Sequence, residues 1–375
     1  MKIAVPKETK VKENRVALSP EVVKDLIKKG FAVTLEKGAG ENSYFNDDTY
    51  TAAGATVADR KGVFADADVL LCVNAPSPED IAGMKKGAAL LSFMYAATHP
   101  ELVNACVKAG ISAFSVDAIP RISRAQKMDA LSSQANLAGY KAVIIAADAL
   151  GKIFPLMMTA AGTIKPSRVV IMGAGVAGLQ AIATAKRLGA IVEVSDIRPE
   201  TKEQVQSLGG KFIEVLGDTS VKIEGGYVKG VSEEFLKKQQ ELIAKHVSDA
   251  DIVITTALIP GKKAPLLISE AMVSSMRNGS VIVDMAVEQG GNVAGSELNK
   301  TVVKNGVKII GESNLPGLLP LNASELYAKN IATFLLHLAT NEGFKWEMEE
   351  EITKGSLIVH NGTAVHPMVT KAVNA

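Results

Sequence analysis

The chain has 375 residues, of which 47% are hydrophobic and 22% are charged, and its net charge is +1. A chain of this length holds about two domains, and its composition is that of a folded globular protein rather than a disordered one. The balance of 41 basic and 40 acidic residues gives no general attraction to nucleic acid or to an anionic membrane. We therefore expect no nucleic-acid partner.

The apolar segments are too interrupted to span a bilayer. The stretch from Ala142 to Gly162 contains Asp148 and Lys152, whereas a spanning helix needs about 20 mostly apolar residues. The first residues, MKIAVPK, lack the apolar core of a secretion signal. Cys72 and Cys106 lie in apolar surroundings and are too few for a disulfide framework or a zinc site. We expect buried thiols and a reducing, cytoplasmic compartment.

The first third of the chain alternates strand-like and helix-like segments. Ser19 followed by Pro20 indicates a helix start, and a helix is predicted over 100–108, closed by Gly110. Strands are predicted at 3–6, 31–35, 69–73, 88–94 and 111–116. This alternation predicts a mostly parallel sheet. No strand here precedes a G-x-G-x-x-G motif, so we expect a Rossmann-like unit without a phosphate loop.

A helical pattern over 123–150 predicts one long helix that joins two domains. Beyond it, six strands are predicted at 169–172, 191–195, 212–215, 251–255, 281–284 and 307–310. Helical runs between most of them predict a six-stranded doubly wound unit. The glycine-rich residues 216–231 are expected to form a mobile loop.

The C-terminal part is predicted to return to the first domain, with a helix over 324–339 and a last strand over 357–360. The fold class is therefore α/β, with two Rossmann-like doubly wound domains joined by long helices and a discontinuous N-terminal domain. We expect residues 1–130 and 320–375 to form the domain without a phosphate loop. Residues 140–319 are expected to form the nucleotide-binding domain.

The sequence GAGVAG at 173–178 is the strongest chemical motif in the chain. It follows a β-branched strand and precedes a helix, the context in which such glycines bind a dinucleotide. Gly173 allows a tight turn, Gly175 lets the backbone approach a pyrophosphate, and Gly178 lets the helix pack closely on the strand. The helix N-terminus offers N–H groups and a partial positive charge to phosphate. The alternative is a glycine turn that binds no nucleotide.

Asp196 ends the next strand, about 20 residues beyond the glycines. An acid there accepts hydrogen bonds from the adenosine ribose and repels a 2′-phosphate, which predicts NAD(H) rather than NADP(H). Arg198 complicates this prediction because a nearby arginine can accommodate the extra phosphate.

A second polar cluster lies at 120–136. Gln126 and Ser132 can hold a nicotinamide carboxamide, while Arg121 and Asp129 can pair and fix their orientation. The alternative is a solvated helix start with Ser123 as its N-cap. The five histidines make no pair at metal-ligand spacing, so no metal is expected.

Four segments resemble the soluble NAD(H)-binding component (domain I of the alpha subunit) of proton-translocating NAD(P) transhydrogenase. They are RISRAQKMDALSSQANLAGYKAV, MMTAAGTIKPSRVVIMGAGVAGLQAIATAKRLGA, TKEQVQSLGGKFIEV and ITTALIPGKKAPLLI, and the similarity extends from MKIAVPKE to AVHP. The resemblance implies hydride transfer between NADH here and NADP⁺ on a partner beta subunit, coupled to proton translocation by membrane-spanning subunits. It also implies a homodimer, peripheral on the cytoplasmic face of a bacterial inner membrane.

The same resemblance implies two sets of site residues. The catalytic set beside the nicotinamide is Arg121, Gln126, Asp129 and Ser132. The cofactor-binding set is Lys127, Met128, Gly173, Gly175, Val176, Gly178, Asp196, Ile197, Arg198, Gly226 and Tyr227. The last two are similar to the family's mobile loop, which closes over the nucleotide.

Alanine dehydrogenase is similar as well and provides the alternative function. Alanine dehydrogenase has an arginine that matches Arg15 and an acidic residue that matches Glu288. The lysine and the histidine around its pyruvate site are replaced here by Asn74 and Tyr95. Reducing a keto acid requires a proton donor, whereas hydride exchange between two nicotinamides moves no proton. The two replacements therefore favour the transhydrogenase. A nucleotide-sensing protein that transfers no hydride is the third hypothesis.

Overall fold

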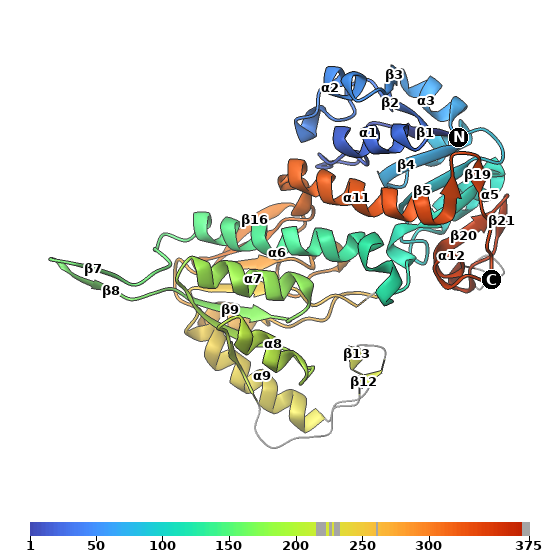
Figure 1. Ribbon diagram of the computed structural model, residues 1–375. Helices are drawn as coiled ribbons and strands as arrows, with labels where there is room; N and C mark the ends of the chain where they lie inside the picture. Colours follow the sequence, from blue (N-terminus) through green and yellow to red (C-terminus); the bar gives the residue numbers. More distant parts are fainter. Residues whose placement is uncertain (215–222, 225–226, 229–232, 260–261, 370–375) are drawn as a thin grey trace. The chain divides into compact units, whose positions relative to one another are not determined.

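The computed structural model describes residues 1–214, 223–224, 227–228, 233–259 and 262–369 (Figure 1). The chain forms two compact units. Unit 1 comprises Met1–Gln134 and Pro316–Ala375, and unit 2 comprises Ala135–Leu315. Unit 1 is thus discontinuous in sequence, whereas unit 2 is continuous.

Unit 1 contains an eight-stranded sheet in the order β21-β20-β6-β5-β4-β1-β2-β3. Its parallel strands are β1 (Lys2–Val5), β2 (Ala32–Glu36), β3 (Thr56–Ala58), β4 (Val69–Asn74), β5 (Ala89–Phe93) and β6 (Ser112–Ser115). The late strand β20 (Leu357–His360) belongs to this sheet and is antiparallel to β6 and to β21 (Thr363–Ala364). The sequence did not indicate β3, because three half-exposed or exposed residues give no apolar run.

Helices cover both faces of this sheet. They are α1 (Pro20–Lys28), α2 (Asp47–Ala52), α3 (Arg60–Asp66), α4 (Pro78–Ala82), α5 (Pro100–Ala109), α11 (Pro320–Leu338) and α12 (Glu351–Ser356), with 3-10 turns η1 (Glu41–Ser43), η2 (Val116–Ala118) and η5 (Pro316–Leu318). Alternate strand residues enter different cores, because side chains alternate across a strand. Ile3 packs with residues of α1 and α11, and Ala4 packs with residues of α3, α4 and α5.

Unit 2 contains a seven-stranded sheet in the order β11-β10-β9-β14-β15-β17-β16. The strands are β9 (Arg168–Met172), β10 (Ile191–Ser195), β11 (Lys211–Phe212), β14 (Ile252–Thr255), β15 (Val281–Asp284), β16 (Lys300–Lys304) and β17 (Val307–Gly311). All pairings are parallel except β16 with β17. Five of the predicted strands are present with nearly the predicted bounds, and the strand predicted at 212–215 corresponds to the two-residue β11. The two-domain α/β fold class is confirmed.

The prediction of only six strands in unit 2 was wrong, because β16 adds an antiparallel edge. Its residues are largely exposed, so they give no buried run. Asn305 and Gly306 form the connecting turn with φ of 49° and 76°, the left-handed pair that a tight hairpin requires. An Asn-Gly pair is typical of a two-residue hairpin turn, so the sequence did contain an indication of β16.

The prediction of a single helix over 123–150 was also wrong. The structure has a 3-10 helix, η3 (Ser123–Met128), followed by the α-helix α6 (Ala130–Ala149). Asp129 interrupts the two, and its carboxylate accepts hydrogen bonds from the backbone and hydroxyl of Ser132. An acid that caps the new helix stabilises the break.

The other helices of unit 2 are α7 (Val176–Arg187), α8 (Thr201–Ser207), α9 (Glu233–Ser248), α10 (Glu270–Ser275) and the 3-10 turn η4 (Val287–Gln289). Short hairpins complete the fold: β7 (Met157–Thr159) with β8 (Gly162–Ile164), β12 (Ile223–Glu224) with β13 (Tyr227–Val228), and β18 (Ala339–Thr340) with β19 (Gly343–Phe344). Within the described ranges, no helix combines the length and the apolar character needed to cross a membrane. The two cysteines are free and buried, as predicted.

Candidate functional site

The glycine motif follows β9 and leads directly into α7. Gly173 has φ of +108°, and a Cβ atom there would lie 2.4 Å from the hydroxyl oxygen of Thr256. A Cβ on Gly178 would lie only 1.9 Å from the carbonyl oxygen of Gly173. Neither glycine can be replaced without moving the backbone of the turn.

The N-terminus of α7 is open. Gly175 is its N-cap residue and supplies no side chain to bond the first-turn N–H groups. A Cβ at Gly175 would meet nothing within 4 Å, and Val176 is exposed. First-turn N–H groups, which lack partners within the helix, and the helix dipole make such an end suitable for a phosphate.

Asp196 follows β10 and is bonded to the glycine turn. Its Oδ2 accepts from the Ala174 N–H at 2.7 Å and from an Arg198 Nη at 2.9 Å. Its Oδ1 accepts from the Arg198 N–H at 2.8 Å and from Nε at 3.0 Å. The guanidinium of Arg198 is therefore engaged by the carboxylate beside it, and Ile197 between them is exposed.

Thr256, after β14, is a further residue of this region that was not expected from the sequence. Its hydroxyl donates to the carbonyl groups of Met172 at 3.2 Å and Gly173 at 3.1 Å. Its N–H donates to Met172 as well. The pair of threonines in the ITTALIP segment was a usable signal, because polar residues after a buried strand lie at the edge where α/β sheets bind ligands.

The 120–136 cluster lies on η3 and the start of α6, and its residues up to Gln134 belong to unit 1. Arg121, Gln126 and Lys127 are exposed, whereas Met128 is buried. The predicted Arg121–Asp129 pair is not formed among the described residues, because Asp129 faces along α6 toward Ser132, whose hydroxyl donates to it at 2.6 Å. Ser123 is not an N-cap, since η3 has no side-chain cap.

Asn330 on α11 anchors this turn and was missed. Its amide donates to the Lys127 carbonyl at 2.9 Å, and its oxygen accepts from the Ser133 hydroxyl at 2.7 Å. The contact joins residues about 200 positions apart, so no local pattern could have indicated it.

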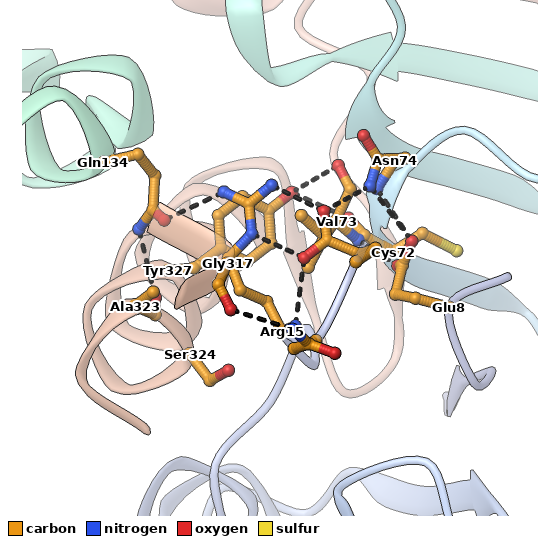
Figure 2. A network of polar contacts seen from close by, with 12 residues as sticks. Glu8, Arg15, Cys72, Val73, Asn74, Gln134, Gly317, Ala323, Ser324 and Tyr327 are labelled. Atoms are coloured by element: carbon orange, nitrogen blue, oxygen red, sulfur yellow. Dashed lines mark hydrogen bonds and ion pairs between the residues drawn. The ribbon is translucent and has the colours of Figure 1, made fainter. Parts of the chain in front are cut away.

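A buried polar network occupies unit 1 around Arg15 (Figure 2). Arg15 Nε and Nη2 donate to the two oxygens of Glu13 at 2.8 and 2.7 Å, and Nη1 donates to Gln134 at 2.9 Å. Asn74 donates from its amide to Glu13 at 2.8 Å and to Glu8 at 3.3 Å. The Arg15 guanidinium is thus held by protein groups.

Glu8 is the titratable member of this network. Burial, reinforced by the negative charge of Glu13, raises the pKa of Glu8 from 4.5 to about 7, against the hydrogen bonds from Val73 and Asn74. Glu8 also lines an open pocket of about 160 Å³ together with Lys7, Lys10, Arg60 and Asn74. Burial alone would raise the pKa of Glu13, but the bonds and charge of Arg15 outweigh it and lower that pKa.

Tyr95, which the sequence comparison matched to a histidine of alanine dehydrogenase, lies just after β5. Its backbone is left-handed, with φ of 46°, and its ring stacks on Phe93 at 5.9 Å between centroids.

Most of the loop expected over 216–231, including Gly226 and the side chain of Tyr227, lies outside the described residues. Across the residues that are described, no three His, Cys, Asp or Glu side chains are placed to hold a metal ion.

The predicted residues therefore form two groups, one in each unit. Unit 1 contains Arg121, Gln126, Lys127, Met128, Asp129 and Ser132, and unit 2 contains Gly173, Gly175, Val176, Gly178, Asp196, Ile197 and Arg198. Hydrogen bonds join Asp129 to Ser132 in the first group and Asp196 to Arg198 in the second.

Comparisons with known proteins match both halves of the chain. Residues 4–138 match the N-terminal domain and residues 142–367 match the C-terminal domain of alanine dehydrogenase/PNT. An NAD(P) transhydrogenase alpha subunit of Rhodospirillum rubrum is 50% identical, over 99% of each chain. Alanine dehydrogenase of Bacillus subtilis is 32% identical, over 99% of this chain and 94% of that one.

A solved structure is similar in fold as well as in sequence. The crystal structure of transhydrogenase from Sinorhizobium meliloti matches with a TM-score of 0.90 and 45% identity, over 97% of this chain and 100% of that one. These findings confirm the resemblance drawn from the sequence motifs. The chain belongs to the alanine dehydrogenase/PNT family.

Proposed function

We propose that the chain is the NAD(H)-binding subunit of a proton-translocating NAD(P) transhydrogenase. The observation that carries the proposal is the 50% identity to a transhydrogenase alpha subunit across 99% of both chains, against 32% to an alanine dehydrogenase. In this function NADH supplies a hydride to NADP⁺ bound on a partner beta subunit. Membrane-spanning subunits couple that transfer to proton translocation, which places this chain on the cytoplasmic face of the membrane.

Unit 2 suits NAD(H) in two respects. The uncapped N-terminus of α7 and the glycines before it offer backbone donors to a pyrophosphate. Asp196 offers a carboxylate to the adenosine ribose, and Arg198 is paired with that carboxylate rather than turned toward a 2′-phosphate. In the proposed complex the ribose hydroxyls share the Asp196 carboxylate with Arg198.

Unit 1 suits a reaction without a proton transfer at the acceptor. Asn74, in place of a lysine, is a neutral amide that donates to Glu13 and Glu8. Arg15, which a keto acid would need, is occupied by Glu13 and Gln134. This arrangement supports the transhydrogenase over the amino-acid dehydrogenase, because position 74 carries no lysine and Arg15 is already engaged by protein groups.

The exposed Gln126 and the Asp129–Ser132 pair are assigned to the nicotinamide. A neutral amide can hold the carboxamide of the ring, and the hydrogen bond from the Ser132 hydroxyl fixes the Asp129 carboxylate. Lys127 and Met128 belong to the same turn, which Asn330 fixes from α11. Orientation of the ring is the contribution that such groups make to hydride transfer.

Functional assembly is proposed to be a homodimer, and the hairpin β7–β8 supports it. The hairpin projects from unit 2 (Figure 1), all six of its strand residues are exposed, and Met158 is 76% exposed. Residues 155–164 include no charged side chain. A lone two-stranded hairpin is marginally stable in water, and an uncharged edge invites pairing. A second copy offers the same edge, as a two-fold interface requires.

Light scattering after gel filtration tests the proposed dimer. The double change Leu156→Lys, Met158→Lys places charges on the hairpin and is expected to convert a dimer into a monomer. Val303→Lys, on an edge strand and also well exposed, should leave the dimer intact. A monomeric wild-type protein, or a hairpin variant that stays dimeric, contradicts the proposed interface.

One assay separates the three candidate functions. The purified chain is mixed with NADH, ammonia and pyruvate, and then with NADP⁺ and an NADP(H)-binding partner subunit. Hydride transfer only with the partner is expected. Pyruvate reduction by the chain alone would identify an alanine dehydrogenase, and NADH binding without any transfer would identify a nucleotide sensor.

Gln126→Ala tests the assigned site within the same assay. The change removes the amide without touching the glycine motif, so it should slow hydride transfer far more than it weakens NADH binding. Arg124→Ala is the matched control, because Arg124 lies on the same turn but pairs with Glu350 and Glu351. Equal transfer rates in wild type and Gln126→Ala would remove Gln126 from this role.

A further inference from the structure

Asn292 is a fully buried residue of unit 2, and every polar atom it carries is hydrogen-bonded. Its side-chain nitrogen donates to the carbonyl groups of Ala257 at 2.9 Å and Pro265 at 2.7 Å. Its side-chain oxygen accepts from the Ala257 N–H at 3.1 Å. Its own carbonyl accepts from Leu267 and Ile268. One side chain therefore fixes both ends of the segment between Ala257 and Pro265.

Asp284, at the end of β15, holds Asn292 in place. The Asn292 N–H donates to both Asp284 oxygens at 3.1 Å, and the Ala286 N–H and the Thr255 hydroxyl also donate to that carboxylate. Asp284 is fully buried. Gly291 has φ of +78°, and a Cβ there would lie 2.6 Å from Asp284 Oδ2. The carboxylate, the glycine and Asn292 form one rigid support behind the segment.

The supported segment borders the glycine motif. Residue Thr256, next to Ala257, is bonded to Met172 and Gly173. The strand order of the sheet reverses between β9 and β14, and doubly wound sheets bind dinucleotides at that reversal. Asp196 follows β10 and belongs to the adenosine side of the reversal, so residues 256–259 after β14 belong to the opposite, nicotinamide side.

The segment presents apolar side chains that the described residues of unit 2 leave open to solvent. Leu258 and Ile259 are 44% and 37% exposed, next to a buried strand. Ligand sites are lined mostly by apolar side chains. A flat aromatic ring and its ribose can pack against them only if the backbone beneath them is held still.

We propose that Asn292 is a positioning residue for the nicotinamide half of the dinucleotide: its amide fixes residues 256–259 so that Leu258 and Ile259 form the apolar surface against which that half lies. Asn292 does not touch the nucleotide itself. The inference rests on the proposed NAD(H) function of unit 2 and adds the residue that orders the second half of the site.

The test compares the affinity of the whole dinucleotide with that of its adenosine half. NADH binding is followed by nucleotide fluorescence and AMP binding by calorimetry, in wild type and in Asn292→Ala. Loss of the amide leaves three backbone groups of the segment unpaired, so the Kd of NADH is expected to rise about tenfold. The Kd of AMP should change less than about twofold, because Asp196 and the glycine motif are untouched.

A control and a second variant make the result decisive. Ser280 immediately precedes β15, at the end of that strand opposite Asp284, and its buried hydroxyl donates to the Ala250 carbonyl. Ser280→Ala should lower the melting temperature without changing either affinity. Leu258→Ala truncates an exposed side chain and should reproduce the selective loss of NADH affinity even if Asn292→Ala fails to fold.

The possible outcomes are distinct. Equal weakening of AMP and NADH by Asn292→Ala, or unchanged NADH affinity in Leu258→Ala, overturns the positioning role. A wild-type protein that binds neither AMP nor NADH contradicts the proposed function instead, since the role of Asn292 presupposes a working site.

Discussion

Glu8 is expected to make the stability of unit 1 depend on pH near neutrality. Its carboxylate accepts from the Val73 N–H at 2.6 Å and from the N–H and amide of Asn74 at 3.3 Å. These bonds favour the ionised form, but burial and the charge of Glu13 dominate and raise the pKa from 4.5 to about 7. The folded protein therefore binds a proton at this site over a range in which the unfolded chain has released it.

The sign and the size follow from linkage. A raised folded-state pKa means that the contribution of Glu8 is fully present below the unfolded pKa of 4.5 and is lost as the pH rises through 7. Integrating proton uptake between roughly pH 5 and pH 8 gives a loss of about 2.5 kcal/mol in the free energy of unfolding. Such a loss is a large fraction of the stability of a typical domain.

The change Glu8→Gln isolates this effect, because glutamine keeps the shape and does not titrate. Urea unfolding is followed by the fluorescence of Trp346, the single tryptophan, which lies in unit 1. The variant should gain about 2.5 kcal/mol relative to wild type when the pH is raised from about 5 to about 8. Using the difference between the two proteins cancels every other titrating group.

Glu13→Gln tests one cause of the shift within the same network. The pKa of Glu13 is lowered, so Glu13 stays ionised between about pH 5 and pH 8 and its own titration adds nothing there. Its negative charge helps to raise the pKa of Glu8, so removing that charge lowers the pKa of Glu8. Glu13→Gln should therefore gain stability relative to wild type as the pH rises, but by less than Glu8→Gln does. A Glu8→Gln difference that is flat, or that favours wild type as the pH rises, refutes the reasoning about Glu8.

The glycine turn, the acid beside it and the buried thiols give three further expectations. Gly178→Ala places a Cβ 1.9 Å from the Gly173 carbonyl and should cost about 1–3 kcal/mol in the free energy of unfolding and abolish NADH binding, measured by thermal melting and fluorescence titration. Asp196→Ala should weaken NADH binding about tenfold and strengthen NADPH binding, because the Arg198 guanidinium is released; an unchanged ratio of the two affinities contradicts this. Burial raises the pKa of Cys106 to about 12 and raises the pKa of Cys72 well above its ordinary value, so neither thiol should react with a disulfide reagent near pH 8 until urea is added.

The buried parallel strands of both sheets could be predicted because such strands are continuous apolar runs. The glycine turn could be predicted equally well, because the glycine motif follows a predicted strand and precedes a predicted helix. Edge strands such as β3 and β16 were missed because exposed residues break the apolar pattern. The Asn305–Gly306 turn shows that turn chemistry can indicate such strands when hydrophobicity does not.

The candidate site was predictable only where its residues are neighbours in sequence. Gln126 and Asp129 belong to one short motif, whereas Asn330 reaches them from α11. Similarly, Asn292 contacts Ala257 across 35 positions. The expected Arg121–Asp129 pair failed because a local capping bond to Ser132 satisfies the carboxylate first. Composition indicates which groups are available, but tertiary packing decides their partners.

The order of synthesis matters for a protein whose first domain is finished by its last segments. Unit 2 is complete at Leu315, but unit 1 lacks α11 and β20 until about residue 360 has left the ribosome. At about 5–20 residues per second, the first 134 residues wait roughly 10 to 50 s for these elements. During that interval β6 has an open edge, and the core face that Tyr327 and Phe334 later cover is bare. The nascent residues 1–134 are therefore expected to depend on chaperones, while unit 2 folds ahead of the completed unit 1.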